Sequence, residues 1–83
     1  MKDRIRQDLI ALMLIPGLSG HEDRVRRHIA ASLPNLPQPP RTDRLGNLIV
    51  TLPGDPQAPS VMVFTHMDQL GFFVRKIEDD GLI

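Results

Sequence analysis

The 83-residue chain contains no cysteine, tryptophan or tyrosine, and its only aromatic residues besides histidine are three phenylalanines. Without cysteine there is neither a disulfide framework nor a thiolate zinc site, so any metal ion must be bound by histidine and carboxylate side chains. Ten basic and ten acidic residues give a formal net charge of zero. This balance provides no broad positive field for nucleic acid or for an acidic membrane surface, and we expect neither as a partner.

Long hydrophobic runs are also absent. The longest uninterrupted apolar run, from Leu9 to Ile15, is far shorter than the roughly 20 residues that a bilayer-spanning helix needs. Gln7 and Asp8 interrupt the basic start of the chain, and no small-residue cleavage pattern follows the apolar run, which argues against a signal peptide. Together with the missing cysteines, these features predict a soluble, cytoplasmic protein.

The N-terminal part of the chain has the pattern of two amphipathic helices. Apolar residues recur at helical spacing from Lys2 to Ile15, and Pro16-Gly17 ends that pattern. A second stripe of apolar residues, four apart on one face, ends near Leu33. Before it, Ser19-Gly20-His21-Glu22 fits a capping box, in which the serine and glutamate side chains satisfy exposed amide donors of the first helical turn.

The rest of the chain predicts strands that follow a stiff connector. Residues 34–40 contain four prolines, which is too many for a helix or a central strand. We predict strands over residues 48–52, 61–65 and 72–77, the second of them apolar at consecutive positions and therefore buried on both faces. Glu78-Asp79-Asp80-Gly81 predicts a hairpin turn, because Asp-Gly tolerates positive φ angles. Helices followed by such strands predict the front portion of a larger α/β protein.

Reactive side chains coincide with a favourable position only at Thr65-His66-Met67-Asp68, directly after the predicted buried strand. In open α/β sheets, ligands bind at the carboxyl ends of the strands. The imidazole of His66 can bind a metal ion through one ring nitrogen while the other donates to a carboxylate, and Asp68 is near enough for that role. A histidine at a strand end can also cap backbone groups, so the motif alone leaves both interpretations open.

The other histidines and the basic cluster beside them favour a solvated helix surface. The sequence His21-Glu22-Asp23-Arg24-Val25 is not the His-Glu-x-x-His zinc motif, because Val25 stands where the second histidine is needed. His28 lies two helical turns from His21, too far for the two to share one ion. The arginines between them follow two acidic residues, which indicates a solvated face and not a phosphate or nucleic-acid site.

Four segments form an ordered set of landmarks along the chain. They are Leu18-Ser19-Gly20-His21-Glu22, Thr42-Asp43-Arg44-Leu45-Gly46-Asn47-Leu48-Ile49, His66-Met67-Asp68-Gln69-Leu70-Gly71-Phe72-Phe73-Val74, and Ile77 with Gly81. In this order they resemble the N-terminal part of the tetrahedral aminopeptidases, a dinuclear metallopeptidase family that includes glutamyl and deblocking aminopeptidases. The resemblance implies that residues 1–70 are the N-terminal portion of a zinc-exopeptidase-like α/β/α catalytic domain. It also implies that residues 71–83 begin an inserted β-barrel dimerisation domain.

The resemblance implies roles for individual residues of the site. His66 corresponds to a ligand of one of two divalent metal ions, zinc or cobalt. Asp68 corresponds to the catalytic-site aspartate that orients this ligand. The family usually has glutamate after that aspartate, whereas this chain has Gln69, and the difference falls on neither role. One further landmark looks structural and not catalytic: Asp43, Gly46 and Asn47.

The implied activity is that of a metal-dependent aminopeptidase, which releases N-terminal residues from peptide substrates. The family forms homo-oligomers, with twelve subunits in its complete shell. Two metal ions activate water by lowering its pKa and clamp the attacking and leaving oxygens, which one histidine and one aspartate cannot do. We therefore expect the remaining ligands and the general base to lie in later parts of a longer chain, and the 83 residues alone to be inactive.

Three other functions are compatible with these residues. A non-catalytic interaction module would dock on a partner through its hairpin or its amphipathic helices. A related dinuclear deacylase or dipeptidase would share the metal ligand and differ in the spacing of later ligands. A glycoside hydrolase needs two carboxylates that flank the scissile bond, and Asp68 has no evident partner, so this activity ranks below the others.

Overall fold

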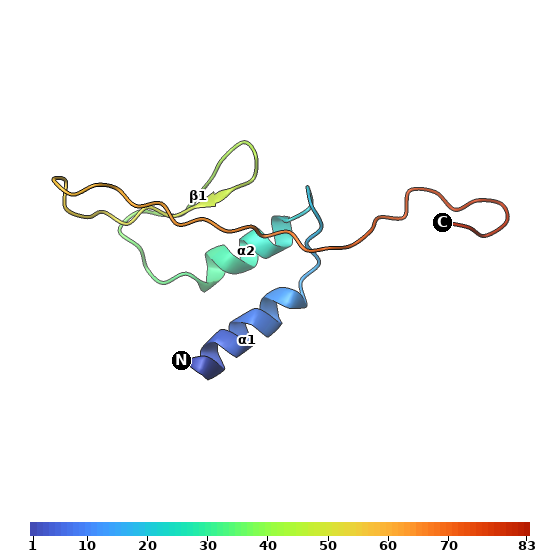
Figure 1. Ribbon diagram of the computed structural model, residues 1–83, viewed down its shortest axis with the longest axis horizontal. Coiled ribbons are helices and arrows are strands. Elements are labelled where there is room, and N and C mark those ends of the chain that lie inside the picture. The colour runs from blue at the N-terminus through green and yellow to red at the C-terminus, as the bar shows by residue number, and fades with distance from the viewer.

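A computed structural model describes all 83 residues as two helices, a two-stranded sheet and long extended segments (Figure 1). The elements in chain order are α1 (Lys2–Met13), α2 (Asp23–Ser32), β1 (Arg41–Thr42) and β2 (Leu48–Ile49). Both predicted helices are present, and the combination of helices with a sheet is compatible with the predicted α/β class. Neither helix has the length and apolar character that crossing a membrane requires.

The start of α2 differs from the predicted capping box. Glu22 is the N-cap residue of this helix and its side chain makes no capping bond, whereas Ser19 lies in the turn before it. The Glu22 carboxylate instead accepts the backbone N–H of Gly20 at 2.7 Å. Gly20 has φ +82°, a conformation that glycine adopts without steric cost, and it turns the chain ahead of the helix. The turn therefore takes up the residues that were expected to cap α2.

The antiparallel pair of β1 and β2 is closed by a loop that Asp43 organises. Arg41 pairs with Ile49 in this sheet. The Asp43 carboxylate accepts the backbone N–H groups of Leu45 at 3.0 Å and Asn47 at 2.9 Å, and the side-chain amide of Asn47 at 2.8 Å. These bonds, chiefly the one from the Asn47 side chain, favour the ionised carboxylate and lower the pKa of Asp43. The role is structural, in agreement with the sequence analysis.

The strands predicted after β1 are shortened or missing. The segment 48–52 contributes only the two residues of β2, and residues 61–65 and 72–77 are extended without a paired strand. Between 85% and 92% of each of the residues 61–64 is exposed, so the predicted burial on both faces is wrong for this chain. A strand needs a neighbour to pair its backbone N–H and C=O groups, and neither run is paired with another strand.

The turn near the C-terminus confirms the hairpin prediction at residues 78–81. The backbone N–H of Gly81 donates to the carbonyl of Glu78 at 2.9 Å, and that of Glu78 donates to the carbonyl of Leu82 at 2.8 Å. Gly81 has φ +88°, in the region where glycine avoids the steric cost that other residues meet. This turn forms because its bonds are local. In Figure 1 it closes the red end of the chain, away from both helices.

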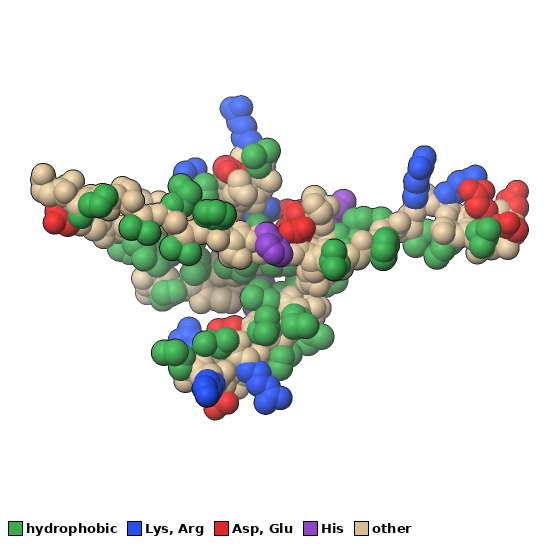
Figure 2. Space-filling model, viewed as in Figure 1, with side chains coloured by type: hydrophobic (Ala, Val, Ile, Leu, Met, Phe, Trp, Pro, Cys, Tyr) green, Lys and Arg blue, Asp and Glu red, His purple; other side chains and the backbone are tan.

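The packed part of the molecule is small. The radius of gyration is 17.5 Å, against about 12 Å for a compact domain of this length. Val25 of α2 is 3% exposed and is the only buried hydrophobic side chain. It packs against Gly17, where an added Cβ would come within 2.6 Å of the valine Cγ2. Other apolar residues, such as Leu12, Ile29 and Ile49, are half-buried, and many more are exposed, as the green atoms on the surface show (Figure 2).

Candidate metal centre

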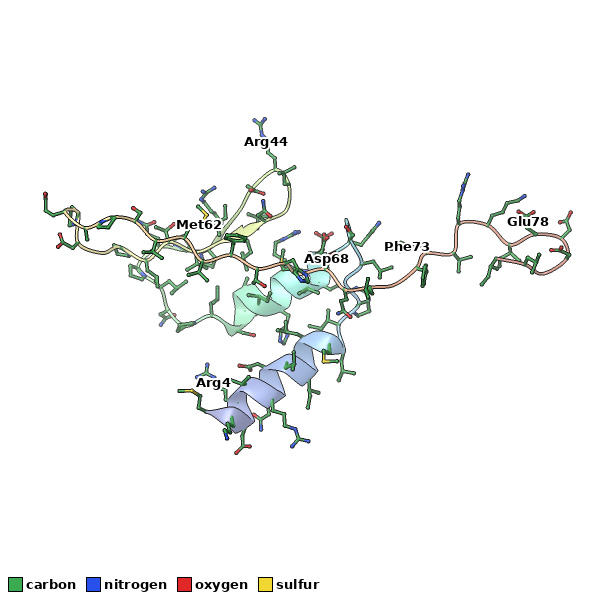
Figure 3. All side chains as sticks on the ribbon, viewed as in Figure 1. Arg4, Arg44, Met62, Asp68, Phe73 and Glu78 are labelled. Atoms are coloured by element: carbon green, nitrogen blue, oxygen red, sulfur yellow. The ribbon has the colours of Figure 1, made fainter.

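The segment that carries His66 and Asp68 crosses the packed part of the molecule. A parallel bridge joins Gln69 to Leu18, in which the backbone N–H of Gln69 donates to the carbonyl of Gly17 at 2.8 Å. Figure 3 shows Asp68 where the extended chain passes the N-terminal end of α2. The backbone of the segment that follows the predicted buried strand is thus attached to the loop after α1.

His66 and Asp68 contact each other directly. The Nδ1 atom of His66 lies 3.1 Å from the Asp68 carboxylate oxygen Oδ1 and 3.1 Å from the Asp68 backbone carbonyl oxygen. Since both neighbours are acceptors, the tautomer that satisfies them carries its proton on Nδ1. The other ring nitrogen, Nε2, makes no hydrogen bond and keeps its lone pair. This arrangement matches a metal-binding histidine whose second nitrogen is held by a carboxylate.

The exposure of the pair is uneven. The His66 side chain is 83% exposed and that of Asp68 is 43% exposed, so the imidazole projects to solvent from a partly covered carboxylate. Imidazole and carboxylate suit zinc and cobalt, in agreement with the donor set that a chain without cysteine can offer. No group of three or more metal-ligating side chains occurs in the structure. The two residues therefore fit part of a metal site.

Neither of the other two histidines is hydrogen-bonded to this pair. The ring of His21 packs on Phe73, with 4.5 Å between ring centroids and 54° between their planes. This contact joins residues 52 positions apart, and no sequence pattern indicated it. His28 lies on α2, and its backbone carbonyl accepts the Ser32 hydroxyl at 2.7 Å. Neither histidine is brought to His66.

One arginine of the basic cluster is structural, which corrects the prediction that the cluster is a solvated face. The Arg26 side chain is 19% exposed and pairs with Asp23. Its Nη1 also donates to the carbonyl of Gly46 at 3.0 Å and so connects α2 to the loop between β1 and β2. The guanidinium thus acts as a cross-link between two elements, and the acidic residue ahead of it is its partner.

Gln69 has a role that the sequence analysis did not assign. Its Nε2 donates to the backbone carbonyl of Ile15 at 2.6 Å and also lies 3.3 Å from that of Leu12. These carbonyls belong to the C-terminal end of α1 and to the residues that follow it. The only indication of this role in the sequence is that Gln69 stands where the family that the chain resembles usually has glutamate.

Comparison with known proteins relates the C-terminal part of the chain to a family. The profile of the family described as M42 glutamyl aminopeptidase matches residues 46–83. The glutamyl aminopeptidase of Lactococcus lactis subsp. cremoris is 40% identical over 72 residues, which cover 86% of this chain and 20% of that protein. Residues 46–83 thus match the M42 glutamyl aminopeptidase family. The resemblance to its N-terminal portion is confirmed.

Two further relatives also carry the name of aminopeptidases. The lysyl aminopeptidase of Pyrococcus furiosus is 38% identical over 69 residues, 82% of this chain and 19% of that protein. SgcX of Escherichia coli strain K12 is 34% identical over 84 residues, 100% of this chain and 22% of that protein. The chain thus spans about a fifth of the length of these relatives. No solved structure matches it.

The M42 profile covers the candidate site. His66, Asp68 and Gln69 fall within the matched residues 46–83, whereas His21 and His28 precede them. The histidine that the geometry favours as a metal ligand is therefore the one inside the M42 match.

Proposed function

We propose that the protein to which this chain belongs is a metal-dependent aminopeptidase that hydrolyses N-terminal residues from peptides. The observation that carries the proposal is the contact of His66 Nδ1 with Asp68 in the segment that the M42 profile matches. This contact leaves the lone pair of Nε2 free to bind a metal ion. The family resemblance implies the same chemistry for this histidine.

The proposed metal centre is dinuclear and contains zinc or cobalt. His66 supplies one ligand through Nε2, and the remaining ligands come from parts of the protein outside these 83 residues. When bound, the metal ions lower the pKa of water and stabilise charge on the oxygens of the peptide bond under attack. Asp68 acts through His66, because its carboxylate and its carbonyl hold the proton on Nδ1 and fix the plane of the ring.

The exposed apolar segments support the proposal that further chain packs on this one. Residues 61–64 carry four apolar side chains that are almost fully exposed, and a folded protein rarely leaves a contiguous apolar surface uncovered. We propose that residues 1–70 belong to a zinc-exopeptidase-like α/β/α domain, in which further chain covers the exposed residues 61–64. Residues 71–83, with the turn at 78–81 already formed, would begin an inserted β-barrel domain.

The relatives suggest the class of substrate. One is named a glutamyl and another a lysyl aminopeptidase, so the feature common to both names is the removal of an N-terminal residue. We propose the same class of reaction here, with a peptide as substrate and its free amine as the recognised end. Homo-oligomeric assembly and a cytoplasmic location stay predictions of the family resemblance.

Paired peptide substrates test this function. The full-length protein is stripped of metal, reloaded with Co²⁺ or Zn²⁺, and offered one peptide with a free N-terminus and the same peptide with an acetylated N-terminus. We expect release of the first amino acid from the free peptide alone, and only after metal is added. Cleavage of the acetyl group alone, or of dipeptides alone, would indicate a related deacylase or dipeptidase and would contradict the proposal.

A further inference from the structure

Gln69 makes every hydrogen bond that joins residues 51–83 to residues 1–50. Its backbone N–H donates to the carbonyl of Gly17 at 2.8 Å. Its side-chain Nε2 donates to the carbonyl of Ile15 at 2.6 Å and approaches that of Leu12 at 3.3 Å. One residue, placed next to Asp68 in the chain, therefore carries the polar connection between the candidate site and the first helix.

At the end of α1 the carbonyls of Ile10 and Leu12 accept the backbone N–H groups of Leu14 and Ile15, each at 3.2 Å, whereas the carbonyl of Ile15 accepts a hydrogen bond from Gln69 alone. The last carbonyls of a helix have no partner within it and carry the negative end of the helix dipole. The last turn of α1 contains no basic residue, and its C-cap is Leu14 in a right-handed helical conformation, without the glycine of a common C-terminal motif. A carboxamide N–H₂ group offers two donors in this negative environment. Gln69 thus supplies the donor for the Ile15 carbonyl, which lies just past the C-cap of α1.

We propose that Gln69 is a positioning residue whose carboxamide fastens the His66–Asp68 segment to the C-terminal end of α1. His66 is three residues before this attachment and Asp68 one, so the attachment sets where the imidazole stands relative to the helix. The role in metal binding rests on the proposed function, whereas the attachment itself does not. A glutamate at this position could not replace the amide, because an ionised carboxylate has no proton to donate and is repelled by the carbonyl oxygens.

Three substitutions of Gln69 in the full-length protein distinguish the effect of its hydrogen-bond donor from that of its side-chain shape. Gln69→Met keeps the length of the side chain without a donor, Gln69→Glu keeps the shape with a negative charge, and Gln69→Lys restores a donor. Hydrogen exchange of the residue-69 amide reports its bond to Gly17 in each variant and requires no metal. Titration with Co²⁺ of the metal-free folded protein reports the position of His66.

We expect the residue-69 amide of Gln69→Met to exchange about tenfold faster than in the wild type. Exchange in Gln69→Glu should be faster still, and exchange in Gln69→Lys should be close to wild type. The proposal is overturned if Gln69→Met stays within twofold of the wild type or if Gln69→Lys fails to restore protection.

The Co²⁺ titration distinguishes a positioning role from a merely structural one. We expect Gln69→Met to bind Co²⁺ about tenfold more weakly, as for other residues that orient a metal ligand, and Gln69→Lys to recover this loss. Unchanged affinity in a folded Gln69→Met protein would overturn the positioning role. If the wild type itself binds no Co²⁺, the proposed function fails, and hydrogen exchange alone then decides whether the attachment exists.

Discussion

The Nδ1 atom of His66 lies 3.1 Å from Oδ1 of Asp68, and the carbonyl oxygen of the same aspartate lies at an equal distance. Two acceptors from one residue therefore converge on one ring nitrogen. The consequence is chemical, because they fix the tautomer and direct the lone pair of Nε2 outward. A pair of residues separated by a single position in the chain thus leaves one imidazole nitrogen with a lone pair that a metal ion could use.

Substitution of Asp68 should weaken metal binding in a graded way. Asp68→Asn keeps an acceptor of the same shape and loses the charge, so we expect Co²⁺ affinity to fall about tenfold. Asp68→Ala removes the side-chain acceptor and should cost up to about a hundredfold. Isothermal titration of the full-length protein measures both, and equal affinity in Asp68→Ala and the wild type would contradict the orienting role.

The loop between β1 and β2 should loosen in acid. Folding lowers the pKa of Asp43, so the folded loop favours the ionised carboxylate. Its stabilising contribution is complete above the unfolded pKa, about 3.9, and is lost as the pH falls through the lower folded value. Amide exchange of Leu45 and Asn47, corrected for its intrinsic pH dependence, follows this loss. Asp43→Asn should abolish the transition, and a transition that persists in this variant would assign it to another group.

Because Gly17 contacts Val25, substitutions at these two positions should change the free energy of unfolding non-additively. Gly17→Ala places a Cβ 2.6 Å from the stiff valine side chain, and we expect it to destabilise the full-length protein by about 1–3 kcal/mol. Gly54→Ala is the matched control, because no atom lies within 4 Å of its added Cβ. Val25→Ala makes room, so the double variant should lose less than the sum of the single losses in denaturant unfolding. Strict additivity would contradict this packing.

The isolated 83-residue polypeptide should neither unfold cooperatively nor hydrolyse peptides. Val25 is its one buried hydrophobic side chain, and cooperative unfolding requires a larger core. The chain also has no cluster of three or more side chains that could bind a metal ion together. Circular dichroism during heating should show a broad, gradual change, and the metal-loaded polypeptide should release no N-terminal residue. A sharp transition, or metal-dependent release, would contradict this expectation.

The features that are predicted correctly from the sequence are held by interactions between residues close together in the chain. The helix from Lys2 and the turn at 78–81 form where they were predicted, because their bonds span four residues or fewer. The contact of His66 with Asp68 is equally local. The strand predicted at 61–65 depends on partners that no segment of this chain provides, so its apolar pattern is exposed instead.

Interactions between distant residues could not be predicted. The bonds of Gln69 to Leu12 and Ile15 span more than fifty residues, and the packing of His21 on Phe73 spans a similar distance. Neither the spacing nor the type of these residues indicates a partner, because the path of the chain between them decides which side chains meet. The family resemblance supplied the role of His66 but not the contacts that hold its segment in place.

The most direct measurement is Co²⁺ binding by the metal-free, full-length protein in three forms: wild type, His66→Ala and His28→Ala. His28 lies on α2, makes no hydrogen bond to His66 or Asp68, and is the matched control. If His66 is a metal ligand of an M42 aminopeptidase, His66→Ala loses one tightly bound ion per subunit together with metal-dependent peptide hydrolysis, and His28→Ala keeps both. Wild-type stoichiometry and activity in His66→Ala would contradict the assignment of the metal centre.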